Sequence, residues 1–464
     1  MADRKAEPYL NSDQNSFAFT SATKRWPVIL TQAIDAVFRA SPGTSDELKT
    51  KEGRKIVEEL VKLKYELQHN RALSPLRDDG LPDIAHYNDA LAELGEPRWL
   101  DLSWLFSECY LYRRISTSFT TSTQWKSFDV FLSSKLTTLR SSLPAILELA
   151  HRYSSITTPS TFTDEASSLL FHEIFLICLW GNATDLSLLT SLSYEQIQSL
   201  QGSHARKESE KNILANDLDK IYTLLTSLKA SGQKEIRVDI VLDNSGFELF
   251  VDLYLAGYLL SQGLATNIVL HPKNHPWFVS DVLPSDFAIL LNALQDPIDF
   301  FITKNDNEHE IKHELNDQDA DAIKGLFASL ATFHAEGKMT IRTNKYWTTQ
   351  DPFWTLPEDK ELWEDLKSSE LVIYKGDLNY RKLTGDVAWP PTTPFDEALQ
   401  TIGKGSGCRT LALRTCKGDV VVGLDEGVDE RLRREYKDNV DDQAKRSWAW
   451  YGKYAVVQFC DGKA

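Results

Sequence analysis

Apolar residues recur at helical spacing through the first half of the chain. Between Trp26 and Phe38 they fall at Ile29, Ala33 and Val37, among other positions, and this is the spacing of one helix face. The same pattern predicts further helices over Glu47–Leu67, Trp104–Ile115, Val130–Leu139, Ala145–Tyr153, Ser167–Trp180 and Asp217–Leu228. We therefore expect residues 1–230 to form a helical N-terminal domain.

The pattern changes after an exposed connection, which the polar run Gln201–Asn212 predicts. Ile236–Leu242 alternates apolar and polar residues, as a strand does. Further strands are predicted over Thr266–His271, Met339–Thr343, Leu371–Lys375, Thr410–Arg414, Asp419–Leu424 and Tyr454–Phe459, with Thr410–Arg414 and Asp419–Leu424 paired as a hairpin. The helices predicted among them are Phe247–Leu260, Asp286–Leu294, Asp317–His334, Glu358–Glu370 and Pro394–Gln400. Alternating strands and helices predict that residues 231–464 form a three-layer α/β/α sandwich with a largely parallel sheet.

Composition and charge narrow the class of protein. The chain has 464 residues, and 42% of them are hydrophobic, which is enough to bury a sizeable core. Its formal net charge of -16 disfavours nucleic acid and anionic membranes as partners, because like charges repel. An anionic substrate would need a local cluster of cations.

Targeting signals and cysteine usage bear on location. The N-terminal residues lack the apolar segment of a secretory signal, and the most apolar stretch, Leu169–Trp180, is too short to span a membrane and is broken by His172 and Glu173. The five cysteines are scattered and form no CxxC pair, which predicts reduced thiols. We expect a protein of the cytoplasm, with the nucleus as a further location. The sequence identifies no protein partner.

Polar side chains gather after four of the predicted strands. The strand at Ile236 ends in Asp243-Asn244-Ser245-Gly246, and the strand at Thr266 leads through a loop to Asp281. The later clusters are Lys375–Lys382 and Arg414–Lys417. Because ligands of open α/β sheets bind beyond the carboxyl ends of the strands, we expect these clusters to form one site.

The first of these clusters indicates a metal site. Asp243 and Asn244, with Asp281, offer hard oxygen ligands that suit magnesium, manganese or similar ions. The alternative is that Asp243 or Ser245 caps the following helix. Glu248 lies one turn into that helix, where it faces the same cleft or complements the helix dipole.

The later clusters indicate an anionic ligand. Arginine binds phosphate through a planar fork and lysine as a point charge, although surface charge is the alternative interpretation. Asp377 and Asn379 position the substrate or a water, or form turns. The cations at these strand ends are Lys375, Arg381, Lys382, Arg414 and Lys417.

Several other motifs are interpreted as structural or argue against competing classes. Gly403–Gly407 follows a helix and precedes a strand, the reverse of a dinucleotide or methyl-donor loop. The chain has no Walker A run and no GxSxG elbow, and Asp243 lacks the second aspartate of an aspartyl-phosphate hydrolase. An Asx turn at Asn182 and Asp185 and solvated histidines at His309 and His313 are interpreted as structural. An internal ion pair is the preferred interpretation of one further helix, and the alternative is that its side chains reach the cleft: Glu108, Tyr112, Arg113 and Arg114.

Long motifs in the chain resemble the damage-control phosphatase family, and most closely its eukaryotic subfamily marked by an Arg-Thr-x-Lys motif. The resemblance covers nearly the whole chain. The motifs are LDNSGFELFVDL (Leu242–Leu253), PWFVSD (Pro276–Asp281), KGDLNYRKLTGD (Lys375–Asp386), RTCK (Arg414–Lys417), ECYLYRRI (Glu108–Ile115) and LWGNATDLS (Leu179–Ser187).

The resemblance implies an α/β/α domain behind a helical N-terminal part, and a divalent metal. Manganese, nickel and cobalt are the implied ions, with magnesium as a further candidate, held by Asp243, Asn244 and Asp281. The implied substrates are sugar phosphates such as fructose 1-phosphate and fructose 6-phosphate, removed as reactive, glycating metabolites. Together with the residue pattern, the candidate substrate-binding residues are Asp243, Asn244, Glu248, Asp377, Leu378, Asn379, Tyr380, Arg381, Arg414 and Lys417.

The hypothesis from the sequence is a metal-dependent phosphatase. The metal binds a phosphoryl oxygen and the attacking water, while Lys417 and Arg381 neutralise phosphoryl charge. Asp243 and Asp377 are the catalytic candidates, and Asp377 orients the water or a sugar hydroxyl. One alternative is a regulatory protein that binds sugar phosphates without releasing phosphate. A protein carboxyl methyltransferase using S-adenosylmethionine is disfavoured, because no loop suits that donor.

Overall fold

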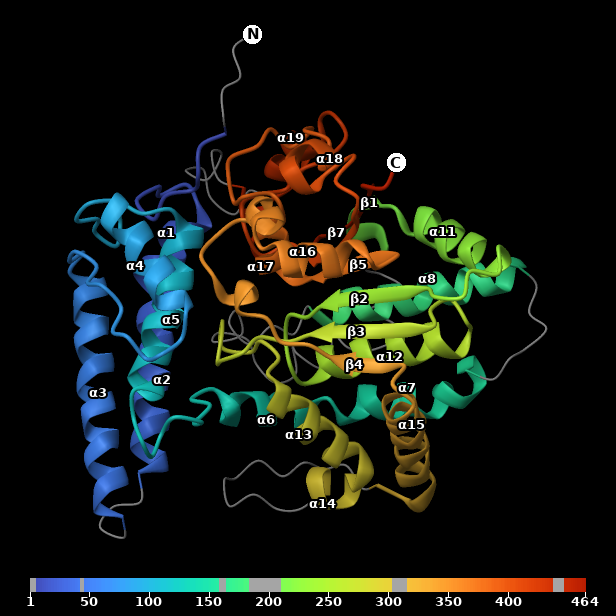
Figure 1. Cartoon of the computed structure of the whole chain (residues 1–464), viewed down its shortest axis with the longest axis horizontal. Coiled ribbons are helices and arrows are strands. Elements are labelled where there is room, and N and C mark those ends of the chain that lie inside the picture. The colour runs from blue at the N-terminus through green and yellow to red at the C-terminus, as the bar shows by residue number, and fades with distance from the viewer. Residues whose placement is uncertain (1–5, 42–45, 158–163, 183–209, 303–314, 437–445) are drawn as a thin grey trace.

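A largely parallel sheet forms the centre of the molecule (Figure 1). The computed structural model describes residues 6–41, 46–157, 164–182, 210–302, 315–436 and 446–464, and within them seven strands form one sheet in the order β1-β7-β6-β5-β2-β3-β4. Neighbouring strands pair in parallel except for β6 and β7, as the sequence predicts for most of the sheet. The strands are β1 (Ile213–Asn216), β2 (Arg237–Val241), β3 (Asn267–His271), β4 (Met339–Ile341), β5 (Leu371–Lys375), β6 (Arg409–Thr415) and β7 (Ala455–Asp461).

Each central strand sends alternate side chains into two different cores, because successive residues of a strand point to opposite faces. Ile240 and Ile373 enter the core on one face, and Val241 and Tyr374 enter the core on the other. All four side chains are buried. The sheet is therefore covered on both faces, which confirms the predicted three-layer α/β/α arrangement.

Helices from the middle of the chain cover the first face. Their apolar side chains share one core with Ile240 and Ile373. They are α7 (Leu143–Thr157), α8 (Asp164–Gly181), α11 (Leu218–Ala230), α12 (Phe247–Ser261), α13 (Pro284–Gln295) and α15 (Asp317–Ala335), with α6 (Leu132–Ser141) and α14 (Pro297–Ile302) beside them.

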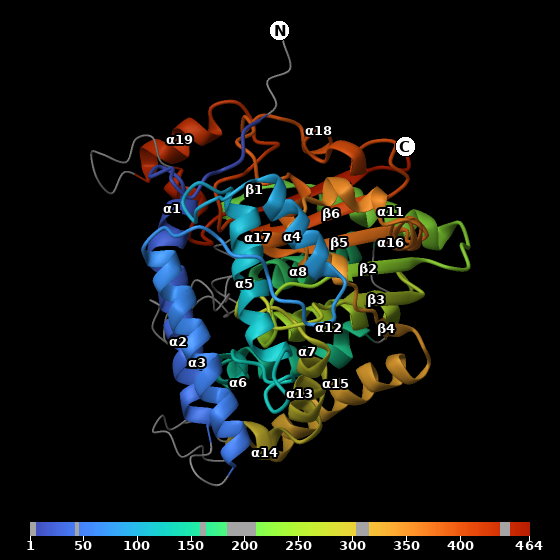
Figure 2. The same ribbon diagram turned by 60° about the vertical axis from the view of Figure 1, so that its left-hand side comes forward.

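The second face is covered by C-terminal helices and by the N-terminal helices. The two sets share the core that receives Val241 and Tyr374, and Figure 2 shows α5 in front of the sheet with α2 and α3 side by side at its flank. The helices are α1 (Phe17–Thr20), α2 (Trp26–Ala40), α3 (Glu47–Gln68), α4 (Asp83–Glu93), α5 (Trp104–Thr120), α16 (Lys360–Lys367), α17 (Gly376–Leu383), α18 (Phe395–Ala398) and α19 (Val428–Glu435). Short 3-10 helices lie at Glu210–Asn212, Lys345–Thr348, Phe353–Glu358, Gln400–Ile402 and Ser447–Ala449, and a π-helical turn lies at Ser21–Arg25.

One predicted element is wrong. Asp419–Leu424 forms no strand, and β6 pairs antiparallel with β7 instead of with a hairpin partner. Val420 and its two neighbours are buried in irregular chain, where the Val420 carbonyl accepts a hydrogen bond from Arg414 and the Val422 carbonyl accepts one from Gln458. The apolar run that resembled a strand is therefore a core-filling loop.

The remaining expectations from the sequence concern the cysteines, membrane-spanning helices and the division of the chain. The five cysteines are free and buried. None of the helices in the described residues combines the length and apolar character needed to cross a membrane. The division of the chain at residue 230 stays a prediction, and β1, which precedes it, belongs to the sheet. The predicted connection Gln201–Asn212 lies largely outside the described residues.

Candidate active site

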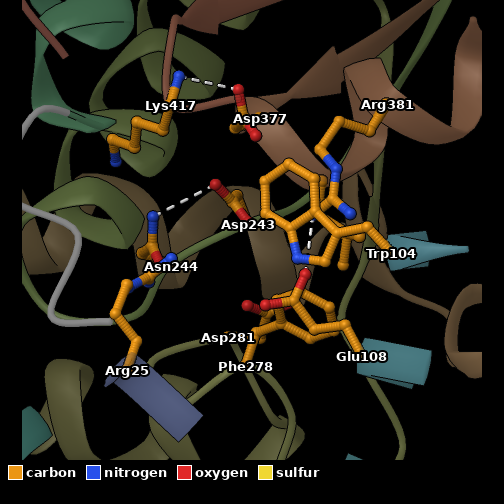
Figure 3. Close-up of a pocket in the computed structure, with 11 residues that line it drawn as sticks. Arg25, Trp104, Glu108, Asp243, Asn244, Phe278, Asp281, Asp377, Arg381 and Lys417 are labelled. Carbon is orange, nitrogen blue, oxygen red and sulfur yellow. Dashed lines mark hydrogen bonds and ion pairs between the residues drawn. The ribbon is translucent and has the colours of Figure 1, made fainter. Parts of the chain in front are cut away.

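A pocket opens beyond the carboxyl ends of β2, β5 and β6, at the edge of the sheet where the sequence predicts a site (Figure 3). β2 and β5 are neighbours whose following connections lead to opposite sides of the sheet, through β3 and β6. Such a switch point is the usual ligand position in open α/β sheets. The pocket is lined by Arg25, Trp104, Glu108, Asp243, Asn244, Phe278, Asp281, Asp377, Leu378, Arg381 and Lys417.

Asp243 lies two residues beyond β2, with its carboxylate fixed from two sides. Its Oδ2 accepts hydrogen bonds from Asn182 Nδ2 at 2.7 Å and from Asn244 Nδ2 at 3.1 Å. The same oxygen lies against the backbone of Gly376, where a Cβ would be only 1.7 Å away. The carboxylate therefore occupies space that only a glycine at position 376 leaves open.

Asn182, at the end of α8, connects several of these side chains. Its Nδ2 donates to Asp243 and to Glu248, both at 2.7 Å. Its Oδ1 accepts a hydrogen bond from Thr415, and its main-chain oxygen accepts one from the Lys417 amino group. The sequence predicts only an Asx turn at Asn182 and does not reveal this connecting role. The predicted partner in that turn, Asp185, lies outside the described residues.

A buried ionic network supports the site from behind. Lys375 Nζ lies 3.0 Å from Glu248 Oε1 and 2.6 Å from Asp252 Oδ1, with all three side chains fully buried. Burial raises the pKa of Asp252 to about 6, against the opposing effect of Lys375. Glu248 Oε2 also accepts from Asn244 Nδ2 at 2.7 Å. Glu248 thus orients Asn244 and does not itself line the pocket.

Asp281 enters the pocket from the loop between β3 and α13. Its Oδ2 lies 3.2 Å from Lys273 Nζ, and its carbonyl accepts a hydrogen bond from Lys135 at 3.0 Å. An isolated antiparallel bridge joins it to Asn244, so these two predicted metal ligands are neighbours. Just before it, Phe278 and Val279 have φ values of 44° and 69°, and such strained backbone clusters at functional sites.

Asp377 is held by the strand-end motif that contains Lys417. Its Oδ1 accepts from Arg414 Nε and from the Lys417 backbone N–H, both at 2.8 Å. Arg414 is fully buried and also donates to the carbonyls of Gly418 and Val420. Arg414 therefore positions Asp377 and the loop and does not line the pocket.

The N-terminal helices close one wall of the pocket. Trp104 and Glu108 are one turn apart on α5, and Arg25 ends the π-helical turn before α2. Arg381 reaches this wall from α17, where its guanidinium lies 2.7 Å from Glu108 Oε2 and 2.8 Å from Asp386 Oδ2. Burial alone would lower the pKa of Arg381, but Asp386 and Glu108 raise it above its ordinary value. Glu108, predicted to form an internal ion pair, does so at the pocket itself.

Two predicted cations face other parts of the molecule. The Lys375 amino group is bound in the network behind the site. The Lys382 amino group donates to the Thr349 carbonyl at 3.0 Å and lies over the Phe353 ring, and burial lowers its pKa to about 8. Of the predicted cations, Arg381 and Lys417 line the pocket, and their contact with an anionic ligand stays a prediction.

The remaining predicted residues of α17 differ in position. Leu378 lines the pocket, whereas Asn379 and Tyr380 do not. Asn379 Nδ2 donates to the Lys375 carbonyl at 2.7 Å, and the Tyr380 hydroxyl donates to Gln458 at 2.8 Å. Their contact with a substrate stays a prediction.

Other candidates lie outside the pocket. Arg113 is buried in an ion pair with Asp79 and Asp83, as predicted for that helix. Gly403–Gly407 precedes β6, which places it at the opposite edge of the sheet from the pocket. His309 and His313 lie outside the described residues.

These features define an α/β protein with an acidic cluster and cations in one pocket at the switch point of its sheet. Comparison with known proteins agrees: the family described as the damage-control phosphatase ARMT1-like domain matches residues 21–432. The damage-control phosphatases ARMT1 of Xenopus laevis and Homo sapiens are 33% and 32% identical to the chain, each comparison covering 96% of this chain and 97% of the relative. The chain belongs to the ARMT1-like damage-control phosphatase family. A crystal structure of a DUF89 family protein from Pyrococcus horikoshii matches at a TM-score of 0.35 and 12% identity, covering 85% of this chain and 90% of that one.

Proposed function

We propose that this chain is a metal-dependent phosphatase of small sugar phosphates, with fructose 1-phosphate and fructose 6-phosphate as candidate substrates and a role in removing reactive metabolites. The proposal rests on one observation: Asp243, Asn244 and Asp281 line the same pocket as Lys417 and Arg381. Phosphoryl transfer needs positioning and balanced charge more than covalent chemistry, and this pocket offers both. Membership of a phosphatase family supports the same reaction.

The donor set fits a hard divalent ion. Asp243 and Asp281 offer carboxylate oxygens, and the Asn244 Oδ1 that accepts a hydrogen bond from Ser280 has a second lone pair. No group of three or more His, Cys, Asp or Glu side chains suited to a metal occurs in the described part of the chain. An ion such as manganese, nickel, cobalt or magnesium would thus complete its shell with water and phosphate oxygens. When bound, it would polarise the phosphoryl group and acidify an attacking water.

The chain's own residues would hold the substrate and balance its charge. Lys417 and Arg381 would neutralise phosphoryl charge, which grows toward the leaving oxygen during reaction. Asp377, fixed through Oδ1, would use Oδ2 to orient a water or a sugar hydroxyl. The hydrogen bond from Asn182 and the close backbone of Gly376 orient Asp243, so its oxygens would meet the ion in a prearranged position.

A screen of phosphate esters with added metals tests the proposal. Chelation should abolish phosphate release, and manganese, cobalt or nickel should restore it. Asp243→Ala and Asp281→Ala should both fold and lose nearly all activity. Full activity in Asp281→Ala would remove that residue from the site.

The same assays separate the alternatives. Binding of fructose 1-phosphate without phosphate release would favour a regulatory protein. A methyltransferase would form methyl esters on protein carboxylates from S-adenosylmethionine, in a reaction that needs Asp243 and survives phosphatase controls. We expect that activity to be absent or marginal.

A further inference from the structure

The pocket wall formed by α5 contains a buried donor with no acceptor among the described residues. Trp104 is 1% exposed, and its indole Nε1 has no hydrogen-bond partner. The residue lines the pocket, and Figure 3 shows the indole nitrogen on the side of the ring that faces the acidic side chains. A buried N–H without an acceptor costs free energy. Other buried tryptophans, such as Trp99, also lack an acceptor for Nε1 among the described residues, but Trp104 lines the pocket, where a bound ligand can supply one.

The Trp104 ring is fixed in place. The Arg381 guanidinium lies 3.4 Å from the ring centroid, and the Phe17 ring meets it edge-on at 5.9 Å. The Trp104 backbone N–H donates to the Tyr9 carbonyl at 2.8 Å, which anchors the start of α5. A donor held this way loses little freedom on binding a ligand.

The neighbouring side chains suit a polyhydroxyl group. Glu108 lies one turn further along α5, and its two oxygens accept from Trp26 and Arg381 while keeping lone pairs for further donors. Phe278 adds an apolar wall, stacked on Tyr112 at 4.6 Å. A donor, a carboxylate acceptor and an aromatic surface together can bind hydroxyl groups and the carbon skeleton that bears them.

We propose that Trp104 determines substrate specificity, with its Nε1–H donating to a hydroxyl or ring oxygen of the organic part of the phosphorylated substrate. Glu108 accepts a substrate hydroxyl beside it. This inference rests on the proposed phosphatase function and assigns the sugar end of the substrate to the N-terminal wall. A phosphate oxygen is the competing acceptor, and substrates with and without hydroxyl groups distinguish the two.

The test compares Trp104→Phe with the matched variant Trp99→Phe. Trp99 is also 1% exposed, and its Nε1 has no hydrogen-bond partner among the described residues, but it packs on Trp26 and Tyr110 and does not line the pocket. Both variants lose the same atoms from a buried ring, and the melting temperature of each reports its own packing cost. kcat/KM is measured with manganese on fructose 1-phosphate and on p-nitrophenyl phosphate, which has no hydroxyl, beside the melting temperature of each variant.

Trp104→Phe should lower kcat/KM on fructose 1-phosphate by about three- to tenfold, the range of one lost hydrogen bond, and leave p-nitrophenyl phosphate within about twofold. Trp99→Phe should spare both substrates. Equal losses on both esters would assign the donor to the phosphoryl group and overturn the proposal. No loss in Trp104→Phe, or an equal loss in Trp99→Phe, would overturn it as well.

Ligand binding at the Trp104 subsite can also be measured without catalysis. If the wild type releases phosphate from no ester, the proposed function fails, and ligand-induced shifts in melting temperature decide the subsite. Fructose 1-phosphate should then stabilise the wild type and Trp99→Phe more than inorganic phosphate does, and Trp104→Phe should lose that excess. An unchanged excess in Trp104→Phe, or no excess in the wild type, would refute the subsite.

Discussion

Lys417 illustrates how one charge is fixed at the pocket. It lies two residues beyond β6 and is 4% exposed. Its amino group donates to the Asn182 main-chain oxygen, and its backbone N–H donates to Asp377. Because both ends of the residue are held, its side chain is fixed at the pocket that it lines.

Lys417→Ala should therefore impair catalysis far more than folding. We expect kcat/KM on fructose 1-phosphate to fall on the order of a hundredfold, as for the loss of one preorganised charge contact. Lys417→Arg should rescue only in part, because the guanidinium fork differs in reach and shape from an ammonium. The measurement is kcat/KM beside the melting temperature, and wild-type catalysis in Lys417→Ala would place the residue outside the site.

Because ligands of open α/β sheets bind beyond the carboxyl ends of the strands, the sequence predicts the site residues that follow strands and misses the others. Asp243, Asp281 and Lys417 all follow predicted strands, and the pocket brings them together. Asn182 directly follows α8 and Trp104 begins α5, and helical periodicity there reveals only burial. The side-chain partners of Asn182 are 61 to 233 positions away in the chain, a separation that no local pattern encodes.

At the scale of elements, the junction of β5 and α17 depends on Gly376. Its φ is 81°, and a Cβ there would lie 1.7 Å from Asp243 Oδ2 and 2.9 Å from Asn182 Nδ2. The first of these contacts is far below any real Cβ distance. The strand and helix can therefore meet next to the Asp243 carboxylate only if residue 376 has no side chain.

Gly376→Ala should displace Asp243 and abolish most of the activity. Gly232→Ala is the matched control, because its φ of 73° brings similar backbone strain while no atom of the described part of the chain lies within 4 Å of where its Cβ would be. Both variants should lose about 1 kcal/mol of stability or somewhat more to strain, but only Gly376→Ala should lose at least about tenfold in kcat/KM. Equal activities of the two variants would contradict the close approach at Gly376.

Long elements with a clear period were predictable, and short or irregular ones were not. The helix predicted over Trp26–Phe38 extends to Ala40, and the strand predicted over Leu371–Lys375 has those bounds. β1 has only four residues at the edge of the sheet, too few to show alternation. The strand predicted over Asp419–Leu424 failed because burial in irregular chain leaves the same apolar run as burial in a strand.

At the scale of the whole molecule, a buried carboxylate ties the N-terminal helices to the C-terminal part of the chain. Asp419 Oδ2 accepts from the Ser16 hydroxyl and the Phe17 backbone N–H, and Oδ1 accepts from Trp450 Nε1, all at 2.8 Å. Arg25 of the pocket ends the π-helical turn that follows α1. Residues from both the N-terminal helices and the C-terminal part of the chain line the pocket, and the division of the chain at residue 230 stays a prediction.

Asp419→Asn should loosen this connection. The amide keeps one acceptor oxygen and turns an NH₂ group toward groups that are already donors, so we expect a loss of about 1–3 kcal/mol in the free energy of unfolding. Amide hydrogen exchange should rise most at residues 16–25, while the sheet stays protected. Asp425→Asn, at an exposed position on the same loop, is the control. A rise in amide exchange that is uniform along the chain of Asp419→Asn would argue against a local connection.

The same carboxylate gives the connection a pH dependence. Burial is the largest influence on the pKa of Asp419 and raises it from 3.8 to about 6, although its three hydrogen-bond donors act in the opposite direction. Between these values the folded chain binds a proton that the unfolded chain releases, so the contribution of Asp419 to the free energy of unfolding grows as pH falls from about 6 toward 4. The Asn variant lacks this titration. The melting temperature of the wild type minus that of Asp419→Asn should therefore increase by a few degrees between pH 7 and pH 4.5, measured against Asp425→Asn. A decrease over that range would mean that the three donors outweigh burial and hold the pKa of Asp419 below its ordinary value.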